Sequence, residues 1–538
     1  MNKRKKYTTA LASSAFLFTL TACTNPFIST SKVSSSSVGT SASTGLSSSS
    51  TGLSSSSTTS SSSSSDPNPG YIKKDIDYCA INRKSSYAPS KGKQKALVIL
   101  VSFSDGYYSI TDGFISKINK YYFGAKTDTP YNWNSLSTYY STASFGKLEL
   151  TGKVTAVYNA TVTSQSIKTS DRSLSDLYSV YDDAISSIQA GTLKASDGST
   201  INLADFDNNN DNFIDSPTFI TNVYDDNIWG STFWPHMSNA EGEGEKKHLF
   251  GTYSSTNMGH ITDNYSGGAR TAIHEQGHVF GLDDYYDYSD AIDENSTQID
   301  LIGGADMQDN TVFDWNPYSK MLMDWVNPYV IDGTKNSVTL TIEPGSTSGD
   351  CVLIPANYST WNGTPYDEYL LLELFTPNGN NELDWKSWKS SYSADLGFGG
   401  IRLYHVDSCL YGYSDTDTLG AWIDDPKNTT YTETETFCNS RLAKDYGYTH
   451  LPKEDADCHQ IQLIQAGKVN TFGSTDETVN HTLTSADLFK SGDKFTFSGY
   501  KDFFPKETTM DNGEDFNYTI DFKSVTSSKA TINITLNN

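Results

Sequence analysis

Residues 274–284 read His274-Glu275-Gln276-Gly277-His278-Val279-Phe280-Gly281-Leu282-Asp283-Asp284, and this stretch decides which fold we expect. It follows Gly267-Gly268 and contains Gly281, so we predict a helix that begins after the glycine pair and is broken at the later glycine. Two histidines four residues apart lie on one face of a helix, where their imidazoles can bind a single ion. We therefore predict that His274 and His278 bind zinc.

The residues around the two histidines supply a candidate third ligand and a candidate general base. Glycine at 281 can adopt a positive φ and turn the chain back, so that Asp284 meets the metal. Asp283 and Asp287 are competing candidates, and the register favours Asp284. Three protein ligands leave a fourth tetrahedral position for water, whose pKa zinc lowers. Glu275, beside the histidines, is then expected to act as the general base.

Other segments predict the regular structure around this motif. The continuous apolar run at 95–103 predicts a central strand buried on both faces, and 218–224 predicts a further strand. Residues 137–146 predict a short helix that closes at a glycine, and 147–155 alternate as a strand does. Beyond Pro328 the pattern changes to short alternating strands at 337–342, 369–375, 401–406 and 530–536. That pattern predicts a β-sandwich appended to the first domain.

The N-terminus carries an export signal and a tether. Basic residues 3–6 precede an apolar stretch at 10–20 that is too short to span a membrane. It ends Leu20-Thr21-Ala22-Cys23, which resembles the bacterial lipoprotein cleavage box. We predict a signal peptide over 1–22 and a lipidated Cys23 that anchors the protein on the extracellular face of the cell membrane, from which it could be released. Residues 23–66, rich in serine, then form a disordered tether.

Composition narrows the class of partners. Lys and Arg number 39 against 64 Asp and Glu, a formal net charge of −25, so nucleic acid would be repelled and is not expected as a partner. The 34 tyrosines and 39 glycines favour a strand-rich α+β protein. Outside the cytoplasm the four cysteines of the C-terminal half could form disulfides, which leaves Cys79 odd, but spacing does not assign the pairs among Cys351, Cys409, Cys438 and Cys458.

A second metal site is predicted in the stretch Asp205-Phe-Asp-Asn-Asn-Asn-Asp-Asn-Phe-Ile-Asp215. Oxygen ligands recur at alternate positions, as in the first part of an EF-hand loop, and Asn212 occupies the usual glycine position. The alternative is a solvated turn rich in Asn and Asp. We expect calcium to bind here through five residues: Asp207, Asn209, Asp211, Phe213 by its carbonyl, and Asp215.

Several segments resemble one family of secreted bacterial enzymes. Asp300-Leu-Ile-Gly-Gly-Ala-Asp-Met307 resembles the methionine-containing turn beneath the metal in metzincin peptidases, where Met307 would pack without binding zinc. Over about 95–535 the chain resembles the immune-inhibitor-A-like metallopeptidases. The segments that carry this resemblance are the zinc motif and residues 98–105, 139–148, 233–236, 284–287, 316–325 and 400–407.

The resemblance implies a metzincin-like zinc metallopeptidase domain over 67–330 followed by an all-β sandwich region over 331–538, in the α+β class. It implies a zinc-dependent endopeptidase that acts on extracellular proteins or peptides, with Glu275 as its base. His236 and His405 are expected to be structural. Residues 308–310 offer no tyrosine where several metzincins place one, so no catalytic tyrosine is carried over.

A binding function is the main alternative. A surface adhesin or receptor could use a metallopeptidase fold without turnover. The intact Glu275 argues for turnover, because binding alone needs no general base. Substrate preference and oligomeric state cannot be derived from the sequence, because they depend on surfaces that distant segments build together.

Overall fold

The computed structural model describes residues 68, 73–74, 88–126, 133–170, 172–210, 212–224, 232–240, 248–262, 269–286, 301–408, 411–414, 421–424, 459–474, 476 and 478–537. The chain divides into two units, Met1–Ser64 and Ser65–Asn538, and all of the described residues belong to the second. The predicted signal peptide, Cys23 and the whole of the tether lie outside the described residues. In the described part of the chain, no helix is both long enough and apolar enough to cross a membrane.

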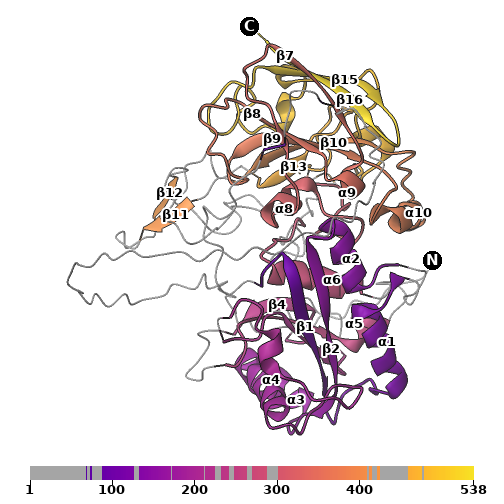
Figure 1. Ribbon diagram of the computed structural model, residues 1–538. Coiled ribbons are helices and arrows are strands. Elements are labelled where there is room, and N and C mark those ends of the chain that lie inside the picture. Colours follow the sequence, from indigo (N-terminus) through magenta and orange to yellow (C-terminus); the bar gives the residue numbers. More distant parts are fainter. Residues whose placement is uncertain are drawn as a thin grey trace, which may run out of the picture. The chain divides into compact units, whose positions relative to one another are not determined.

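Strand β1 (Gly92–Ser102) is an interior strand of the first sheet, and it confirms the strand predicted at 95–103. It pairs in parallel with β2 (Leu148–Asn159) on one side and with β3 (Pro217–Thr221) on the other. Next to β3 lies the parallel β5 (Thr252–Asn257), and the antiparallel β4 (His236–Asn239) forms the edge. The resulting strand order is β2-β1-β3-β5-β4. Figure 1 shows the paired strands β1 and β2 side by side.

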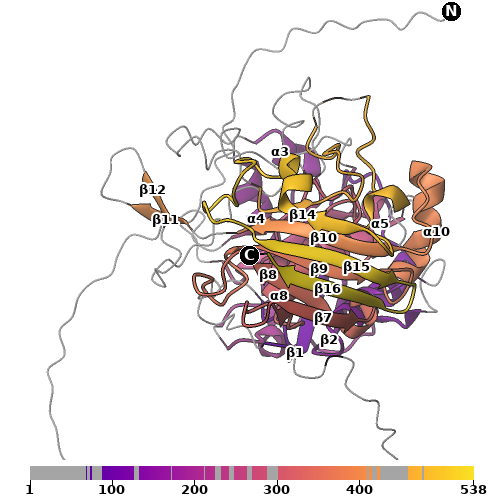
Figure 2. The same ribbon diagram turned by 90° about the horizontal axis from the view of Figure 1, so that it is seen from above.

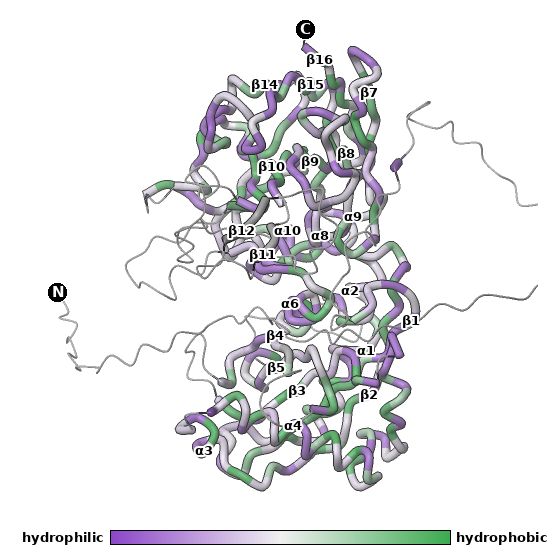
Figure 3. Tube along the Cα trace, turned by 90° about the vertical axis from the view of Figure 1, so that its left-hand side faces the viewer, coloured by the Kyte–Doolittle hydropathy of each residue, from purple (hydrophilic) through white to green (hydrophobic). Residues whose placement is uncertain are grey.

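Both faces of this sheet are buried, as the continuous apolar run of β1 predicted. Because successive side chains of a strand point to opposite faces, Leu97, Ile99 and Val101 enter one core, and Val98 and Leu100 enter the other. The apolar segments of these strands can be followed in Figure 3. The first core is completed by α3 (Ser164–Lys168), α4 (Ser173–Gln189) and the 3₁₀ turn Leu203–Phe206. The second, here called the central core, includes α1 (Asp112–Phe123), α2 (Leu136–Ala143), α5 (Met258–Thr262) and α6 (Arg270–Val279).

Two further sheets follow and pack face to face. The strands predicted at 337–342, 369–375, 401–406 and 530–536 are confirmed as β7, β9, β10 and β16. A five-stranded sheet has the order β13-β10-β9-β8-β6, and a four-stranded sheet has the order β14-β15-β16-β7. Side chains from both of these sheets share one apolar core. Figure 2 shows the sheet β14-β15-β16-β7 lying over the sheet β13-β10-β9-β8-β6. The bounds are β6 Tyr329–Val330, β7 Ser337–Ile342, β8 Cys351–Pro355, β9 Glu368–Phe375, β10 Gly400–Asp407, β13 Ile461–Leu463, β14 Lys494–Thr496, β15 Tyr518–Val525 and β16 Ala530–Leu536.

The region after 331 also contains elements that the strand pattern did not predict, so "all-β" is too simple a description of it. These are the short helix α9 (Gly345–Ser348), the helix α10 (Asn381–Tyr392), 3₁₀ turns at Ser485–Asp487, Phe497–Gly499 and Lys501–Phe503, and a hairpin of β11 (Tyr411–Ser414) and β12 (Ala421–Asp424). Helix α10 forms where Trp388 can bury its ring and donate from Nε1 to the carbonyl of Leu483, 3.0 Å away. The structure is therefore a mixed α/β protein with several sheets, compatible with the predicted α+β class.

The central core crosses the boundary that the sequence predicts at 330/331. It contains Trp315 and Tyr318 from before that point together with Phe375, Trp388 and Tyr404 from after it. The ring of Phe313 lies 5.4 Å from Phe375 and 5.2 Å from Trp388, measured between centroids. The boundary itself stays a prediction, and the shared core shows that the later sheets pack directly on the part of the chain that carries the zinc motif.

Cys351 at the start of β8 is a buried free thiol. Burial raises the pKa of this thiol to about 12. The other four cysteines after Cys23 lie outside the described residues, so disulfides among them stay a prediction.

We expect alkylation of Cys351 at pH 8 to be on the order of 1,000-fold slower in the folded protein than in denaturant, because only the thiolate reacts and burial suppresses it. Mass spectrometry of the peptide that contains Cys351, after timed iodoacetamide labelling with and without guanidinium, measures the ratio. Equal rates in the two conditions would show that the thiol is accessible.

Candidate metal centre

Helix α6 places the two motif histidines on one face, as predicted. The ring centroids of His274 and His278 lie 4.8 Å apart, and their Nε2 atoms are separated by 3.1 Å. The helix is held from the side by α2, where the Tyr140 hydroxyl donates to the carbonyl of Ile273 at 2.7 Å. At its first residue, Arg270 stacks on Trp133 and forms an ion pair with Asp384 of α10. The position of the histidines thus depends on segments that lie more than a hundred residues before and after them in the chain.

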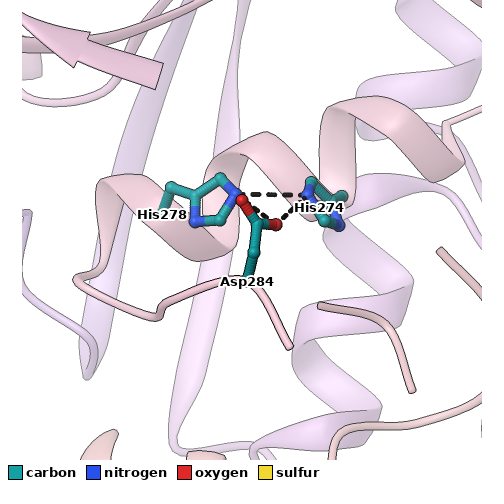
Figure 4. A group of neighbouring side chains, drawn as sticks. All are labelled: His274, His278 and Asp284. Atoms are coloured by element: carbon teal, nitrogen blue, oxygen red, sulfur yellow. Dashed lines mark hydrogen bonds and ion pairs between the residues drawn. The ribbon is translucent and has the colours of Figure 1, made fainter. Parts of the chain in front are cut away.

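Asp284 reaches the two histidines through the turn that the glycine allows. Gly281 has φ 91°, the left-handed conformation that the sequence predicted, and its N–H donates to the carbonyl of His278 at 2.8 Å. One oxygen of Asp284, Oδ1, then lies 2.9 Å from His274 Nε2 and 3.1 Å from His278 Nε2 (Figure 4). Tetrahedral zinc with bonds of about 2.0–2.1 Å holds its ligand atoms about 3.3 Å apart, so this donor set fits the ion.

The competing third ligands are placed differently. Asp283 is exposed, and its carboxylate accepts a hydrogen bond from Gln460 Nε2 at 3.2 Å. Asp287 lies outside the described residues. The structure therefore brings Asp284 to the histidines and turns its neighbour toward another partner.

Two backbone carbonyls orient the imidazoles. His274 Nδ1–H donates to the carbonyl of Met307 at 2.8 Å, and His278 Nδ1–H donates to the carbonyl of Leu282 at 2.7 Å. A carbonyl oxygen can only accept, so each neutral ring carries its proton on Nδ1 and has its lone pair on Nε2. Both lone pairs point into the space beside Asp284, as in histidines that ligate a metal.

The charges of the three side chains favour the binding of a cation between them. Burial by itself would raise the pKa of Asp284, but the two histidines hold that pKa well below its usual range. Burial would lower the pKa of His278, and Asp284 overrides it and raises the pKa to about 10. A cation placed between the three side chains would satisfy Asp284 without protonating the histidines.

Glu275 lies in the same buried environment. Its pKa is raised, mainly by burial, and the nearby histidines oppose part of that effect. Its side chain is 6% exposed. A carboxylate with a raised pKa beside a candidate metal centre is suited to accept a proton and return it.

The loop with Met307 lies against the histidines and is held by the later sheets. Gly303 and Gly304 have φ of 72° and 70°, and Met307 is fully buried. The carbonyls of Leu301, Gly303 and Ala305 accept hydrogen bonds from three donors of the C-terminal region: Leu463 N at 2.9 Å, Leu483 N at 3.0 Å and Arg402 Nη1 at 2.8 Å. The loop therefore takes its shape from segments that follow it by about a hundred residues or more.

Gln308 is a site neighbour that the sequence reasoning missed. Its Nε2 lies 3.3 Å from Nδ1 of His278, and its Oε1 accepts a hydrogen bond from Trp315 Nε1 at 3.1 Å. A Cβ at Gly277 would come within 2.2 Å of the Gln308 Oε1 atom, so the glycine inside α6 allows this close approach. A glycine within a helix is destabilising by itself, so Gly277 was the signal in the sequence that another side chain approaches the helix closely at this point.

The two tyrosines after Asp284 have different surroundings. Tyr285 is buried, and its hydroxyl lies 2.6 Å from Ser319 Oγ. Tyr286 stacks on His274 with centroids 6.2 Å apart, and its hydroxyl hydrogen-bonds to Asp284. Burial and then the nearby carboxylates raise the pKa of Tyr286, so this hydroxyl stays protonated.

The other predicted site residues lie elsewhere. His236 on β4 bonds through Nδ1 to the carbonyl of Trp234 at 2.7 Å, and its Nε2 lies 3.1 Å from the Tyr253 hydroxyl, as a structural histidine does. In the predicted calcium loop, Asn212 has φ 73°, which suits the glycine-like position assigned to it. The Asp207 carboxylate accepts from the amide of Asn212, and the Asp215 carboxylate accepts from two loop amides. Asp211 lies outside the described residues, and calcium binding stays a prediction.

Fold and site together define a mixed α/β protein with several sheets and a buried His/His/Asp cluster that could hold a metal ion. Comparison with models of known protein families and with curated protein sequences finds no match to this chain.

Proposed function

We propose that this protein is a zinc-dependent endopeptidase, tethered at the bacterial cell surface through a lipidated Cys23, that hydrolyses extracellular proteins. The observation that carries the proposal is the convergence of His274 Nε2, His278 Nε2 and Asp284 Oδ1, with the buried Glu275 beside them. The fold assigned with it is a metzincin-like catalytic domain followed by the β-sandwich region. Met307 fits the methionine-containing turn, since it is buried and its carbonyl orients His274.

In this proposal His274, His278 and Asp284 hold the zinc ion. Bound there, zinc would lower the pKa of a water molecule and polarise the peptide carbonyl. The carbonyls of Met307 and Leu282 keep both imidazoles in the tautomer that offers Nε2. Tyr286 hydrogen-bonds to Asp284 and covers the ring of His274, which limits the movement of both side chains.

Glu275 moves the proton in this proposal. Its carboxylate takes a proton from the attacking water and then delivers it to the nitrogen of the leaving amine. Burial raises the pKa of Glu275 and the histidines limit that rise, so both the carboxylate and the protonated form can occur during the cycle. A group that must act as base and then as acid in one cycle works best with a pKa near the working pH.

A calcium ion bound in the loop Asp207–Asp215 would have a structural role in this proposal.

We expect Glu275→Gln to lower the rate of peptide hydrolysis by about 10²–10⁴-fold, the usual contribution of general acid–base catalysis. The full-length protein is assayed on a denatured, fluorescently labelled protein at matched zinc content. Glu149→Gln is the matched control, because Glu149 is exposed in a surface pair with Lys93, and we expect it to keep full activity. Hydrolysis by the Glu275 variant at the wild-type rate would exclude this base.

The binding alternative makes a different prediction. A zinc-loaded wild-type protein that cleaves no member of a broad peptide library would support a surface adhesin that uses the same fold. The buried carboxylate beside the candidate metal centre favours the peptidase, since an adhesin would keep an ionisable group there at a cost in stability and gain nothing from it.

A further inference from the structure

Another cluster of metal-ligating side chains lies in the later sheets. Glu368 is the first residue of β9, His405 lies on β10, and Asp511 lies in the loop between the last 3₁₀ turn and β15. In the register of the two strands His405 pairs with Leu370 and Glu368 pairs with Asp407. Glu368 and His405 are therefore diagonal neighbours on one face of the sheet. This face also carries Leu370 and Leu403 and faces the four-stranded sheet.

The three side chains converge and are buried. His405 Nε2 lies 2.7 Å from Glu368 Oε1 and 4.0 Å from Asp511 Oδ2, and one donor atom of each residue lies within 4.8 Å of the other two. Their exposed fractions are 2% for Glu368, 3% for His405 and 6% for Asp511. A zinc ion with bonds of about 2.0–2.2 Å needs its ligand atoms about 3.3–3.6 Å apart, and the distances of 2.7 and 4.0 Å from His405 Nε2 lie on either side of that value.

Carboxylates outnumber imidazoles in this cluster, where Glu368 and Asp511 face His405. A third carboxylate, that of Asp367, and the ammonium group of Lys506 act on Glu368 with opposite signs. Buried charge of one sign is unfavourable unless it is paired or coordinates a metal. A divalent cation between the three side chains would offset the charges of the Glu368 and Asp511 carboxylates.

The backbone around the cluster is arranged as it is around metal ligands. Glu368 Oε1 accepts the amide of Asp511 at 2.7 Å, and Oε2 accepts the amide of Asn512 at 2.8 Å. These bonds orient the carboxylate, as the hydrogen bonds that surround metal ligands do. They also bring the loop around Asp511 to the start of β9, so an ion here would link β9 and β10 to that loop.

We propose that Glu368, His405 and Asp511 bind a structural divalent transition-metal ion, separate from the centre at His274. The donor set selects zinc over calcium or magnesium, because those two ions prefer oxygen ligands alone and imidazole suits zinc. Its role is to fasten the loop around 511 to the five-stranded sheet. The competing interpretation is a buried imidazolium–carboxylate pair between His405 and Glu368, for which 2.7 Å is also a suitable distance.

The number of zinc ions bound per chain, measured by elemental mass spectrometry, tests this proposal. Full-length protein is equilibrated with zinc, passed through a desalting column and analysed. We expect two zinc ions per wild-type chain, one in His405→Gln, one in Asp511→Asn and one in His274→Gln, and none in the doubly substituted His274→Gln/His405→Gln protein. His236→Gln replaces a buried histidine outside both clusters, and we expect it to keep two.

The outcomes separate this proposal from the proposed function. One zinc per wild-type chain that is lost in His274→Gln and kept in His405→Gln would overturn the structural site and leave the peptidase proposal intact. One zinc that is lost in His405→Gln and kept in His274→Gln would support the structural site and count against the catalytic one. If both variants at 405 and 511 fail to fold, as judged by circular dichroism, stepwise removal of zinc from the wild type with a chelator decides: two classes of zinc support the proposal and a single class overturns it.

Discussion

Replacing Arg402 by methionine is expected to lower the free energy of unfolding by roughly 3–5 kcal/mol, because it leaves a buried carboxylate without its partner. Arg402 on β10 is 2% exposed. Its Nε and Nη2 donate to Glu373 Oε1 at 2.9 and 2.5 Å, and the guanidinium stacks on Phe375 with 3.9 Å to the ring centroid. Methionine keeps most of the apolar stem and removes every donor, so the loss reports on the charge and its hydrogen bonds.

The substitution is also expected to reach the candidate metal centre. Arg402 Nη1 donates to the carbonyl of Ala305, two residues before the Met307 carbonyl that orients His274. Arg402 also stabilises the ionised form of Asp306, whose pKa burial raises to about 6. Without the guanidinium the pKa of Asp306 rises further, and the loop loses the hydrogen bond to the carbonyl of Ala305. We therefore expect zinc affinity to fall about 10–100-fold, the usual cost of losing a group that orients a ligand.

Chemical denaturation followed by tryptophan fluorescence measures the first effect. Lys389→Met is the matched control, because Lys389 pairs with Asp395 at the surface, where both side chains are more than 60% exposed. Pairs of that kind contribute less than about 1 kcal/mol. The double variant Arg402→Met/Glu373→Met should recover much of the loss, since it removes both charges. An Arg402 variant as stable as the Lys389 control would contradict the prediction.

Replacing Asp284 by alanine is expected to weaken zinc binding by more than about 100-fold, because direct ligands contribute more than the groups that orient them. Its Oδ1 atom lies 2.9 and 3.1 Å from the two histidine Nε2 atoms, whereas the carboxylate of Asp283 faces Gln460. Asp283→Ala, one residue away and equal in charge and size, is therefore the matched control, and we expect it to bind zinc as the wild type does.

Competition for zinc with a chromophoric chelator gives the affinity of each variant. The same titration distinguishes the ligands at 274, 278 and 284 from the cluster at 405, since each substitution should affect only its own ion. If Asp283→Ala loses zinc and Asp284→Ala keeps it, the third ligand is Asp283 and the turn after Gly281 differs from the one described. Equal loss in both would indicate damage to the turn itself rather than loss of one ligand.

Local spacing was enough to predict the elements around the site. Helix α6, the left-handed Gly281 and the return of Asp284 all follow from contacts within about ten residues. Such contacts depend on the geometry of a helical turn and on the conformational freedom of glycine, and both can be read from residue types. The buried strand β1 was predictable for a similar reason, because an apolar run bounded by polar residues is recognisable on its own.

Contacts between distant segments were not predictable in this way. Gln308 and Arg402 were missed, and helix α10 was not expected among strands. A signal existed for Arg402, since a charged residue inside the apolar strand Ile401-Arg402-Leu403 must find a buried partner. The partner is Glu373, which faces it across the β9–β10 pair, and only the strand register identifies it.

By itself, the sequence determined which side chains of 274–284 lie close together, because a helix and one glycine turn set those distances locally. The tertiary structure decided which nitrogen of His274 faces Asp284, because the acceptor for its other nitrogen comes from the loop at Met307. That loop is in turn held by Leu463, Leu483 and Arg402. Hydrogen bonds between segments this far apart in the chain depend on how the sheets pack, and residue spacing carries no information about that packing.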